Sequence, residues 1–406
     1  MQKIVQKFGG TSVGTIEKIK HVCSIINKEI KNGNQVAVVS SAMSGETNKL
    51  LSLAENFDIQ NNKLESDMIV STGEQIAISL ISMALKEIGL KGRPLLGWQI
   101  PIIGTKDFTK AKINRIDDKI ILEIMNRGEI PIIAGFQGID EDKNIVTFGR
   151  GGSDTSAVAI AAAIAADRCD IYTDVDGVYT TDPRIVKNAR KLNKISYEEM
   201  LEFASLGAKV LQTRSVEMAM RHEVTVQVLS SISGNTGTFL IKEDEKMENE
   251  LVSGIAYSKD EANLTLINIL DKPGVATKIF SPLGEANINV DMIVQTGSEN
   301  GNNINFTYTV SRKDLEQTIL IMEENKNDIG FERIIRNNSL AKVSIIGLGM
   351  RTHTGVANKM FSALASENIN IHVISTSEIK ISVLIDETAI EKAINVLHST
   401  FELEKK

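Results

Sequence analysis

The sequence predicts an α/β protein in which a mainly parallel sheet lies between two layers of helices and two ferredoxin-like units follow it. Residues 1–230 alternate short strands with longer helical patterns, the order that gives a parallel sheet with helices on both faces. The C-terminal part instead repeats itself at a fixed offset. At 406 residues the chain also exceeds the size that one hydrophobic core usually serves, so two or three domains are expected.

Five strands are predicted in the first part, each short and rich in Val or Ile. They are Lys3–Lys7, Gln35–Ser40, Ile130–Gly135, Arg168–Thr173 and Thr225–Leu229. Open α/β sheets bind their ligands at the carboxyl ends of the strands. The loops that follow these strands are therefore the candidate sites.

A polar segment separates the two parts of the chain. Residues 241–250 are dense in Lys and Glu and have no apolar period to bury, which indicates a linker. We expect a first domain at 1–240, this linker, and two further domains at 251–338 and 339–406.

The two C-terminal domains are predicted from an internal duplication. Gly274–Leu283 recurs as Gly355–Leu364, and Asn287–Asn289 recurs as Asn368–Asn370, both at one offset (355 − 274 = 81). Each copy opens with a strand, continues with a helix that begins at a glycine, and then has a strand that begins at Asn-Ile-Asn. A further strand and helix complete the ferredoxin-like order.

The composition predicts a folded cytoplasmic protein without nucleic-acid or membrane partners. The net charge of −7 is spread along the chain, whereas phosphate binding needs clustered Lys and Arg. Cys23 and Cys169 lie in apolar stretches and are expected to be reduced core thiols. Met1–Phe8 alternates like a strand rather than a signal peptide. The longest apolar run, Ala157–Ala166, is shorter than the about 20 residues that span a bilayer.

The first candidate site is Lys7-Phe8-Gly9-Gly10-Thr11-Ser12, which ends the first strand and leads into a helix. Glycines let backbone N–H groups approach phosphate oxygens, and Lys7 can neutralise charge on a transferred phosphoryl group. A Gly-Gly turn capped by Thr11 or Ser12 explains the residues equally well, since the Walker pattern is absent.

The second candidate site is the glycine-rich loop Gly149-Arg150-Gly151-Gly152-Ser153-Asp154, before an Ala-rich helix. Asp154 or Thr155 as the N-cap would explain only the end of this loop. Three glycines around Arg150 favour a backbone that presents its guanidinium to an anion.

Two further motifs are weaker by themselves. Ser71-Thr72-Gly73-Glu74 places an acid at the start of an apolar helix, where complementing the helix dipole is a sufficient explanation. Thr173–Tyr179, followed by Asp182-Pro183-Arg184, comes directly after a buried strand, where ligands bind in such sheets.

These motifs together resemble the aspartate kinases of the amino-acid kinase superfamily. Lys7–Ser12, Ser40–Met43, Ser71–Glu74, Gly149–Asp154 and Thr173–Arg184 occur in the order and spacing of that family. The C-terminal duplication resembles its tandem ACT domains, so the resemblance covers essentially the whole chain. The Ser44-Gly45-Glu46 segment departs from many relatives, which leaves the loop near Thr47 open.

The resemblance implies direct transfer of the γ-phosphoryl group of MgATP to the β-carboxylate of L-aspartate. By similarity the catalytic residues are Lys7, Arg150 and Asp154. Arg150 is expected to pair with the α-carboxylate of the substrate, and Glu74 and Asp154 with its ammonium group. Further substrate contacts are expected from Ser40, Thr47, Gly151 and Ser153.

The resemblance also implies a nucleotide site and a sensing site. The expected ATP-binding residues are Lys7, Gly9, Gly10, Thr173, Asp174, Tyr179, Arg184 and Lys209. Mg²⁺ is expected to arrive with ATP, with no dedicated protein metal site. The expected effector residues are Asp271, Gly274, Val275, Ala276, Gln295, Asn370 and Ile371. A packing role is as well supported for Val275 and Ile371.

Lysine or threonine, or both, are the expected feedback inhibitors, acting through an equilibrium between active and inactive arrangements. A homodimer or higher oligomer through the ACT domains is expected, and Met247 is a candidate internal start for a separate regulatory chain. Two rival functions remain. One is another amino-acid kinase, such as a glutamate or acetylglutamate kinase, against which Glu74 and the Arg150 loop argue. The other is a non-catalytic amino-acid sensor, against which the intact Lys7 and Asp174 argue.

Overall fold

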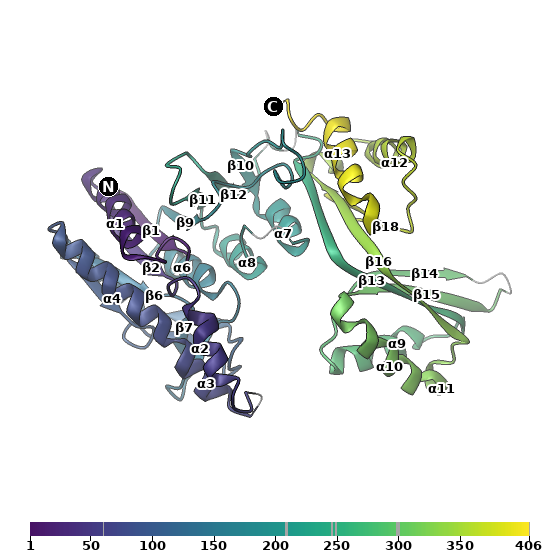
Figure 1. The fold of residues 1–406 in the computed structure, drawn as a ribbon, viewed down its shortest axis with the longest axis horizontal. Coiled ribbons are helices and arrows are strands. Elements are labelled where there is room, and N and C mark those ends of the chain that lie inside the picture. The colour runs from purple at the N-terminus through teal and green to yellow at the C-terminus, as the bar shows by residue number, and fades with distance from the viewer. Residues whose placement is uncertain (60, 208–209, 245–246, 248–249, 298–300, 406) are drawn as a thin grey trace. The chain divides into compact units, whose positions relative to one another are not determined.

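The computed structural model describes residues 1–59, 61–207, 210–244, 247, 250–297 and 301–405. It divides into two compact units (Figure 1). The N-terminal unit is Met1–Tyr179 with Lys191–Asn249, and the C-terminal unit is Thr180–Arg190 with Glu250–Lys406. The short segment Thr180–Arg190 therefore interrupts the sequence of the N-terminal unit but packs with the C-terminal unit.

The N-terminal unit is built on an eight-stranded sheet in the order β10-β12-β11-β9-β1-β2-β6-β3. The strands from β11 to β3 in this order are all parallel to their neighbours, which confirms the mainly parallel sheet. All five predicted strands are confirmed, to within a residue at their ends. The bounds are β1 Lys3–Phe8, β2 Gln35–Ser40, β3 Gly92–Leu95, β6 Ile130–Ala134, β9 Arg168–Thr173, β10 Lys194–Ser196, β11 Val226–Ser230 and β12 Thr238–Ile241.

A smaller four-stranded sheet in the order β5-β4-β7-β8 belongs to the same unit. Its strands are β4 Ile102–Gly104, β5 Ile113–Ile116, β7 Gln137–Ile139 and β8 Ile145–Thr147. The helices of the unit are α1 Ile16–Lys31, α2 Glu46–Ala54, α3 Lys63–Val70, α4 Thr72–Glu87, α5 Lys119–Asn126, α6 Gly152–Ala163, α7 Tyr197–Ser205 and α8 Thr213–His222.

Helices cover both faces of the large sheet because successive strand residues point to opposite faces. Val38 of β2 lies in a core cluster with the buried faces of α1 and α4. The next residue, Val39, faces α6, since it and Ser153 both approach Gly135. Among the described residues one helical stretch, Lys63–Glu87, is long and apolar enough to cross a membrane, but half of its most apolar part is buried inside the protein.

The C-terminal unit is a six-stranded antiparallel sheet in the order β14-β15-β13-β16-β18-β17, with helices packed on it. Its strands are β13 Gly254–Leu270, β14 Val290–Gly297, β15 Asn303–Val310, β16 Arg333–Ile346, β17 Val373–Thr376 and β18 Lys380–Asp386. Its helices are α9 Val275–Glu285, α10 Leu315–Glu324, α11 Lys326–Ile329, α12 Val356–Ser366 and α13 Ile390–Thr400, with 3₁₀ turns η1 Arg312–Asp314, η2 Leu348–Arg351 and η3 Glu387–Ala389.

The two copies of the duplication share their longest strands. The later part of β13 pairs with β15, whereas its first residues, Gly254–Ser258, pair with Val343–Ile346 and their neighbours in β16. The later part of β16 pairs in turn with β18. The first part of β13 therefore supplies the fourth strand of the second copy, while the first part of β16 is the fourth strand of the first copy. The division expected at 338/339 falls inside β16.

Each copy keeps a separate hydrophobic core. The first core lies between α9, α10 and the sheet, and the second lies between α12, α13 and the sheet. Val186 of the Thr180–Arg190 segment is buried in the second core. The carbonyl group of Thr180 accepts a hydrogen bond of 2.7 Å from the N–H of Ile255 in β13. This segment thus belongs to the second copy, although the sequence placed it inside the domain 1–240.

Candidate active site

The carboxyl ends of four parallel strands meet at one edge of the large sheet. Phe8 at the end of β1 is in register with Ser40 of β2 and with Tyr172 of β9, and Ser40 is in register with Ala134 of β6. The chain passes from β1 to β2 on one side and returns to β9 on the other side. This edge is therefore the topological switch point at which open α/β sheets bind ligands.

Lys7 and Asp154 form a nearly buried ion pair at this edge. Lys7 is the penultimate residue of β1, and its Nζ lies 2.6 Å from Oδ1 of Asp154 in the first turn of α6. The side chains are only 10% and 12% exposed. A cation is thus held in a fixed position and with little water at the edge where open α/β sheets bind their ligands.

The two glycines after β1, Gly9 and Gly10, each allow a different neighbour to approach the backbone closely. The N–H of Gly9 donates to the carbonyl oxygen of Tyr172 at 3.2 Å, so this amide is already paired. A Cβ on Gly9 would stand 3.3 Å from Nζ of Lys7, and one on Gly10 would stand 2.9 Å from the carbonyl oxygen of Ala42. Gly9 therefore leaves room for Lys7, and Gly10 leaves room for the loop that contains Ala42.

Glu74 is a buried carboxyl group with only one of its oxygens paired. It lies in the first turn of α4 and is 2% exposed. Its Oε1 accepts a hydrogen bond from the N–H of Ala42 at 3.0 Å, while Oε2 has no partner among the described residues. Burial raises the pKa of Glu74 to about 8, because a charged carboxylate is poorly solvated there. A ligand that supplies an ammonium group would complete its pairing.

The Arg150 loop is shaped by the glycines on each side of it. Gly149 and Gly151 have φ of +66° and +69°, which side chains other than glycine rarely adopt. Gly151 is the N-cap of α6, and a Cβ on it would overlap the Gln212 side chain at 2.0 Å. The prediction of Asp154 or Thr155 as N-cap is wrong, because the left-handed glycine starts the helix three residues earlier. The Arg150 side chain is exposed.

Three hydroxyl groups expected at the substrate site occupy different settings. Ser40 is fully buried and its Oγ donates to the carbonyl oxygen of Ser41 at 2.9 Å. Ser153 lies 8% exposed beside Gly135, where a Cβ on the glycine would be 2.9 Å from Cβ of the serine. Thr47 is half-buried in the first turn of α2.

The expected nucleotide residues are divided between the two units. In the N-terminal unit, Oγ1 of Thr173 donates to Asp174 at 3.0 Å and the hydroxyl of Tyr179 donates to Asp176 at 2.8 Å. Burial, reinforced by Asp176, raises the pKa of Tyr179 to about 12. Lys209 lies outside the described residues.

Arg184 belongs to the C-terminal unit. There its guanidinium group binds Asp182, with Nη2 at 2.7 Å from Oδ2. The same Oδ2 accepts the hydroxyl of Tyr257 in β13 at 3.0 Å.

Sequence reasoning missed the loop that follows β11. Oγ of Ser231 lies 2.8 Å from Oγ of Ser12, and the carbonyl oxygen of Ser231 lies 2.7 Å from Nε2 of His21. These contacts hold the loop after β11 against Ser12, in the loop that follows Lys7. The strand before it was predicted, so the same rule about carboxyl ends of strands could have drawn attention to Ser230–Thr236.

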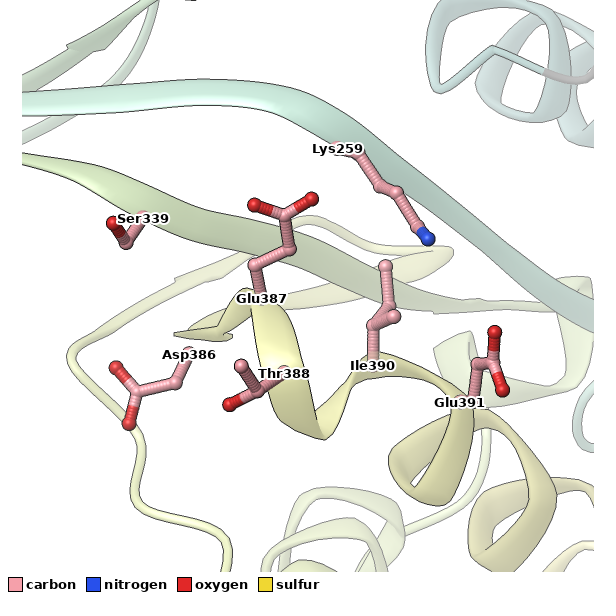
Figure 2. A pocket seen from close by; sticks show the side chains of 7 residues that line it. All are labelled: Lys259, Ser339, Asp386, Glu387, Thr388, Ile390 and Glu391. Carbon is pink, nitrogen blue, oxygen red and sulfur yellow. The ribbon is translucent and has the colours of Figure 1, made fainter.

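Two cavities are lined by residues other than Lys7, Glu74 and Asp154. One, of about 480 Å³, is a polar cavity between α1, the strands β9 and β11, and the loop after β11. The other, of about 700 Å³, lies in the C-terminal unit (Figure 2). Lys259 of β13 and Ser339 of β16 line it, opposite Glu387 and Glu391. Neither hollow is lined by an expected substrate or effector residue.

The expected effector residues fall at three places in the C-terminal unit. Asp271 and Gly274 precede α9, Val275 and Ala276 are its first two residues, Gln295 lies on β14, and Asn370 and Ile371 precede β17. Val275 is 3% exposed in the first core, and Ile371 packs against the second core, so packing accounts for both side chains. The strands β14 and β17 are the opposite edges of the sheet.

Comparison with known proteins places the chain beside one group of enzymes. The model of the amino acid kinase family matches residues 2–230, and that of the ACT domain matches residues 267–325 and 343–401. An aspartate kinase of Pseudomonas putida is 51% identical over 405 residues, covering 100% of this chain and 98% of that protein. Aspartokinase 2 of Bacillus subtilis is 47% identical, covering 100% of this chain and 99% of that protein.

Solved structures give the same result for the fold. Aspartokinase III of E. coli in complex with aspartate and ADP aligns with a TM-score of 0.80 and 28% identity, covering 98% of this chain and 99% of that one. The same E. coli enzyme in complex with lysine and aspartate aligns with a TM-score of 0.78 and 26% identity, at the same coverage.

Proposed function

This chain belongs to the aspartate kinases of the amino acid kinase family, and we propose that it phosphorylates L-aspartate with MgATP. The γ-phosphoryl group passes to the β-carboxylate and gives 4-phospho-L-aspartate, the first step of lysine, threonine and methionine synthesis. One P–O bond forms as another breaks, without a covalent enzyme intermediate. Catalysis of this kind depends on positioning and electrostatics.

The observation that carries the proposal is the pairing state of Lys7, Asp154 and Glu74. The ammonium group of Lys7 is held 2.6 Å from Asp154, in place to neutralise charge on the phosphoryl group in transfer. The unpaired Oε2 of Glu74 is a site for the α-ammonium of the substrate. Arg150 supplies a planar fork for the α-carboxylate, and Ser40, Thr47, Gly151 and Ser153 complete the substrate contacts.

The direct test is a hydroxylamine trapping assay with ATP, Mg²⁺ and either aspartate or glutamate. Hydroxamate from aspartate alone would support the proposal. Product from glutamate would favour the rival amino-acid kinase, and binding of lysine or threonine without any turnover would favour the non-catalytic sensor.

For the nucleotide, support comes from the relative that was solved with ADP and from the position of Thr173 and Asp174 at the carboxyl end of β9. Mg²⁺ is proposed to enter with ATP, since this ion keeps water and phosphate ligands and needs few protein carboxylates. Asp174 is exposed and fits that role. When bound, Mg²⁺ would neutralise charge on the phosphates.

Aspartate binding is expected to release a proton at neutral pH. Because the pKa of Glu74 is raised to about 8, the free enzyme holds this carboxyl group mostly protonated at pH 7, and pairing with the substrate ammonium ionises it. Affinity for aspartate should therefore rise between pH 6 and 8 and level off above that range. Calorimetry in buffers of different ionisation enthalpy measures the proton released. The Glu74→Gln variant should release none, and equal release by both proteins would contradict the assignment.

Lysine, threonine or both are proposed as inhibitors that bind the ACT domains. Gln295 and Asn370 lie at or beside opposite edge strands, separated by five strand spacings of about 4.8 Å each. A site that uses both copies of the duplication would therefore be completed by a second chain, which supports the proposed homodimer. Inhibition assays with each amino acid, together with sedimentation, test this. The internal start at Met247 and the cytoplasmic location stay predictions.

A further inference from the structure

Asp67 is a buried carboxylate whose role the proposed mechanism leaves open. It lies on α3 and is 0% exposed. Its Oδ2 accepts the N–H groups of Thr109 at 2.8 Å and Thr147 at 2.9 Å, and its Oδ1 accepts the hydroxyl of Thr147 at 2.6 Å. All three donors are neutral. Burial raises the pKa of Asp67, and these hydrogen bonds oppose that shift.

Both partners of Asp67 lie at the N-terminal end of the loop that carries Arg150. Thr147 ends β8, two residues before Gly149. Thr109 has φ of +70°, a conformation that needs support in a β-branched residue. The carbonyl oxygen of Thr109 would lie 3.0 Å from a Cβ on Gly149. One carboxylate therefore fixes both the strand that enters the loop and the segment packed against the loop's first glycine.

The backbone of Arg150 is held from its other side as well. Nη2 of Arg214 donates to the carbonyl oxygen of Arg150 at 2.9 Å, and the N–H of Gly152 donates to the carbonyl oxygen of Gly149 at 2.9 Å. The main chain of the loop is thus fixed at several points, whereas the Arg150 side chain is exposed. Such support lets a long side chain bind a ligand with less loss of freedom.

We propose that Asp67 is a positioning residue. It holds the Arg150 loop in the conformation in which Arg150 can bind the α-carboxylate of aspartate. This inference rests on the proposed function, because it takes aspartate as the ligand of Arg150. Asp67 touches neither substrate nor nucleotide. It acts through Thr109, Thr147 and Gly149.

The test compares Asp67→Asn with a matched control. Asparagine keeps the shape of the side chain but is neutral and has one accepting oxygen, so the hydrogen bonds lose the charge of the carboxylate and at least one of the three donors loses its acceptor. We expect KM for aspartate to rise about 10- to 100-fold, because a displacement of about 1 Å caused by a remote substitution can cost about 100-fold, with KM for ATP changed less than about twofold. A Thr147→Val variant, which removes only the hydroxyl donor, should change KM for aspartate in the same direction by a smaller factor.

Asp140→Asn is the control. Asp140 is also buried, at 1% exposure, and accepts the N–H groups of Asp142 and Asn144 at 2.9 and 2.8 Å. It supports the turn between β7 and β8, with no hydrogen bond to Thr109 or Thr147. Its substitution should leave KM for aspartate unchanged.

The outcomes separate this inference from the proposed function. If the unmodified enzyme makes no hydroxamate from aspartate, the proposed function fails before any variant is compared. If that enzyme is active and folded Asp67→Asn keeps the normal KM for aspartate, the positioning role is refuted. A lower melting temperature with both KM values unchanged would also refute it, since that is the signature of a purely structural residue. Should Asp67→Asn fail to fold, an unchanged KM for aspartate in Thr147→Val would refute it equally.

Discussion

Replacing Lys7 by methionine is expected to lower kcat by about 10² to 10³, the usual cost of removing one charge-stabilising group from a transition state. KM for ATP and for aspartate should change much less, because negative charge moves onto the atoms facing Lys7 mainly as the phosphoryl group transfers. Methionine keeps the length and apolar stem of the side chain in a position that is 8% exposed. Steady-state rates at saturating substrates measure the effect.

The Lys7 variant needs a check on folding, because it leaves Asp154 without the ion pair of 2.6 Å. A thermal melt alongside the kinetics provides it. Lys3→Met is a matched control on the same strand, where Nζ donates to the carbonyl oxygen of Ile164 at 2.6 Å, away from the edge. A kcat within threefold of normal for folded Lys7→Met would rule out the proposed role of Lys7.

Replacing Arg150 by methionine is expected to lower kcat/KM for aspartate by about 10² to 10³. The loss of one partner from a charged, hydrogen-bonded pair costs about 2–5 kcal/mol in comparable sites. The melting temperature should stay the same, because the Arg150 side chain is exposed and its main chain is held by Arg214. KM should be measured separately for each substrate. It should rise for aspartate and stay near normal for ATP.

Arg150→Lys adds a second comparison at the same position. Lysine keeps the charge but lacks the planar fork that binds both carboxylate oxygens, so it should recover only part of the lost affinity. Arg127→Met, at an exposed arginine of the same unit, serves as the control. Equal activity of the unmodified enzyme and folded Arg150→Met would show that another group binds the α-carboxylate.

Much of the fold could be predicted from the sequence, because the patterns that mark strands and helix starts lie within short segments. The five predicted strands of the large sheet are confirmed by β1, β2, β6, β9 and β11. Short runs of Val and Ile bounded by polar residues are typical of buried strands, so these could be predicted without the rest of the chain. The duplication likewise predicted helices that begin at Gly274 and Gly355, and both residues are left-handed N-caps. The N-cap of α6 was missed because Asp154 is a good capping residue, yet the packing against Gln212 admits only Gly151 there.

Local signals in the sequence were enough to predict the fold class, the mainly parallel sheet of the first part, the duplicated second part and the motifs at the carboxyl ends of the strands. How those residues are paired depends on the packing of the whole chain. The bond between Lys7 and Asp154, the unpaired oxygen of Glu74 and the three donors on Asp67 join positions far apart in the chain. The same is true of the strands shared by the two copies and of Val186 in the second core. Local patterns report which side chains are buried, but the strand order brings distant ones together, and pairing decides their charge and their chemistry.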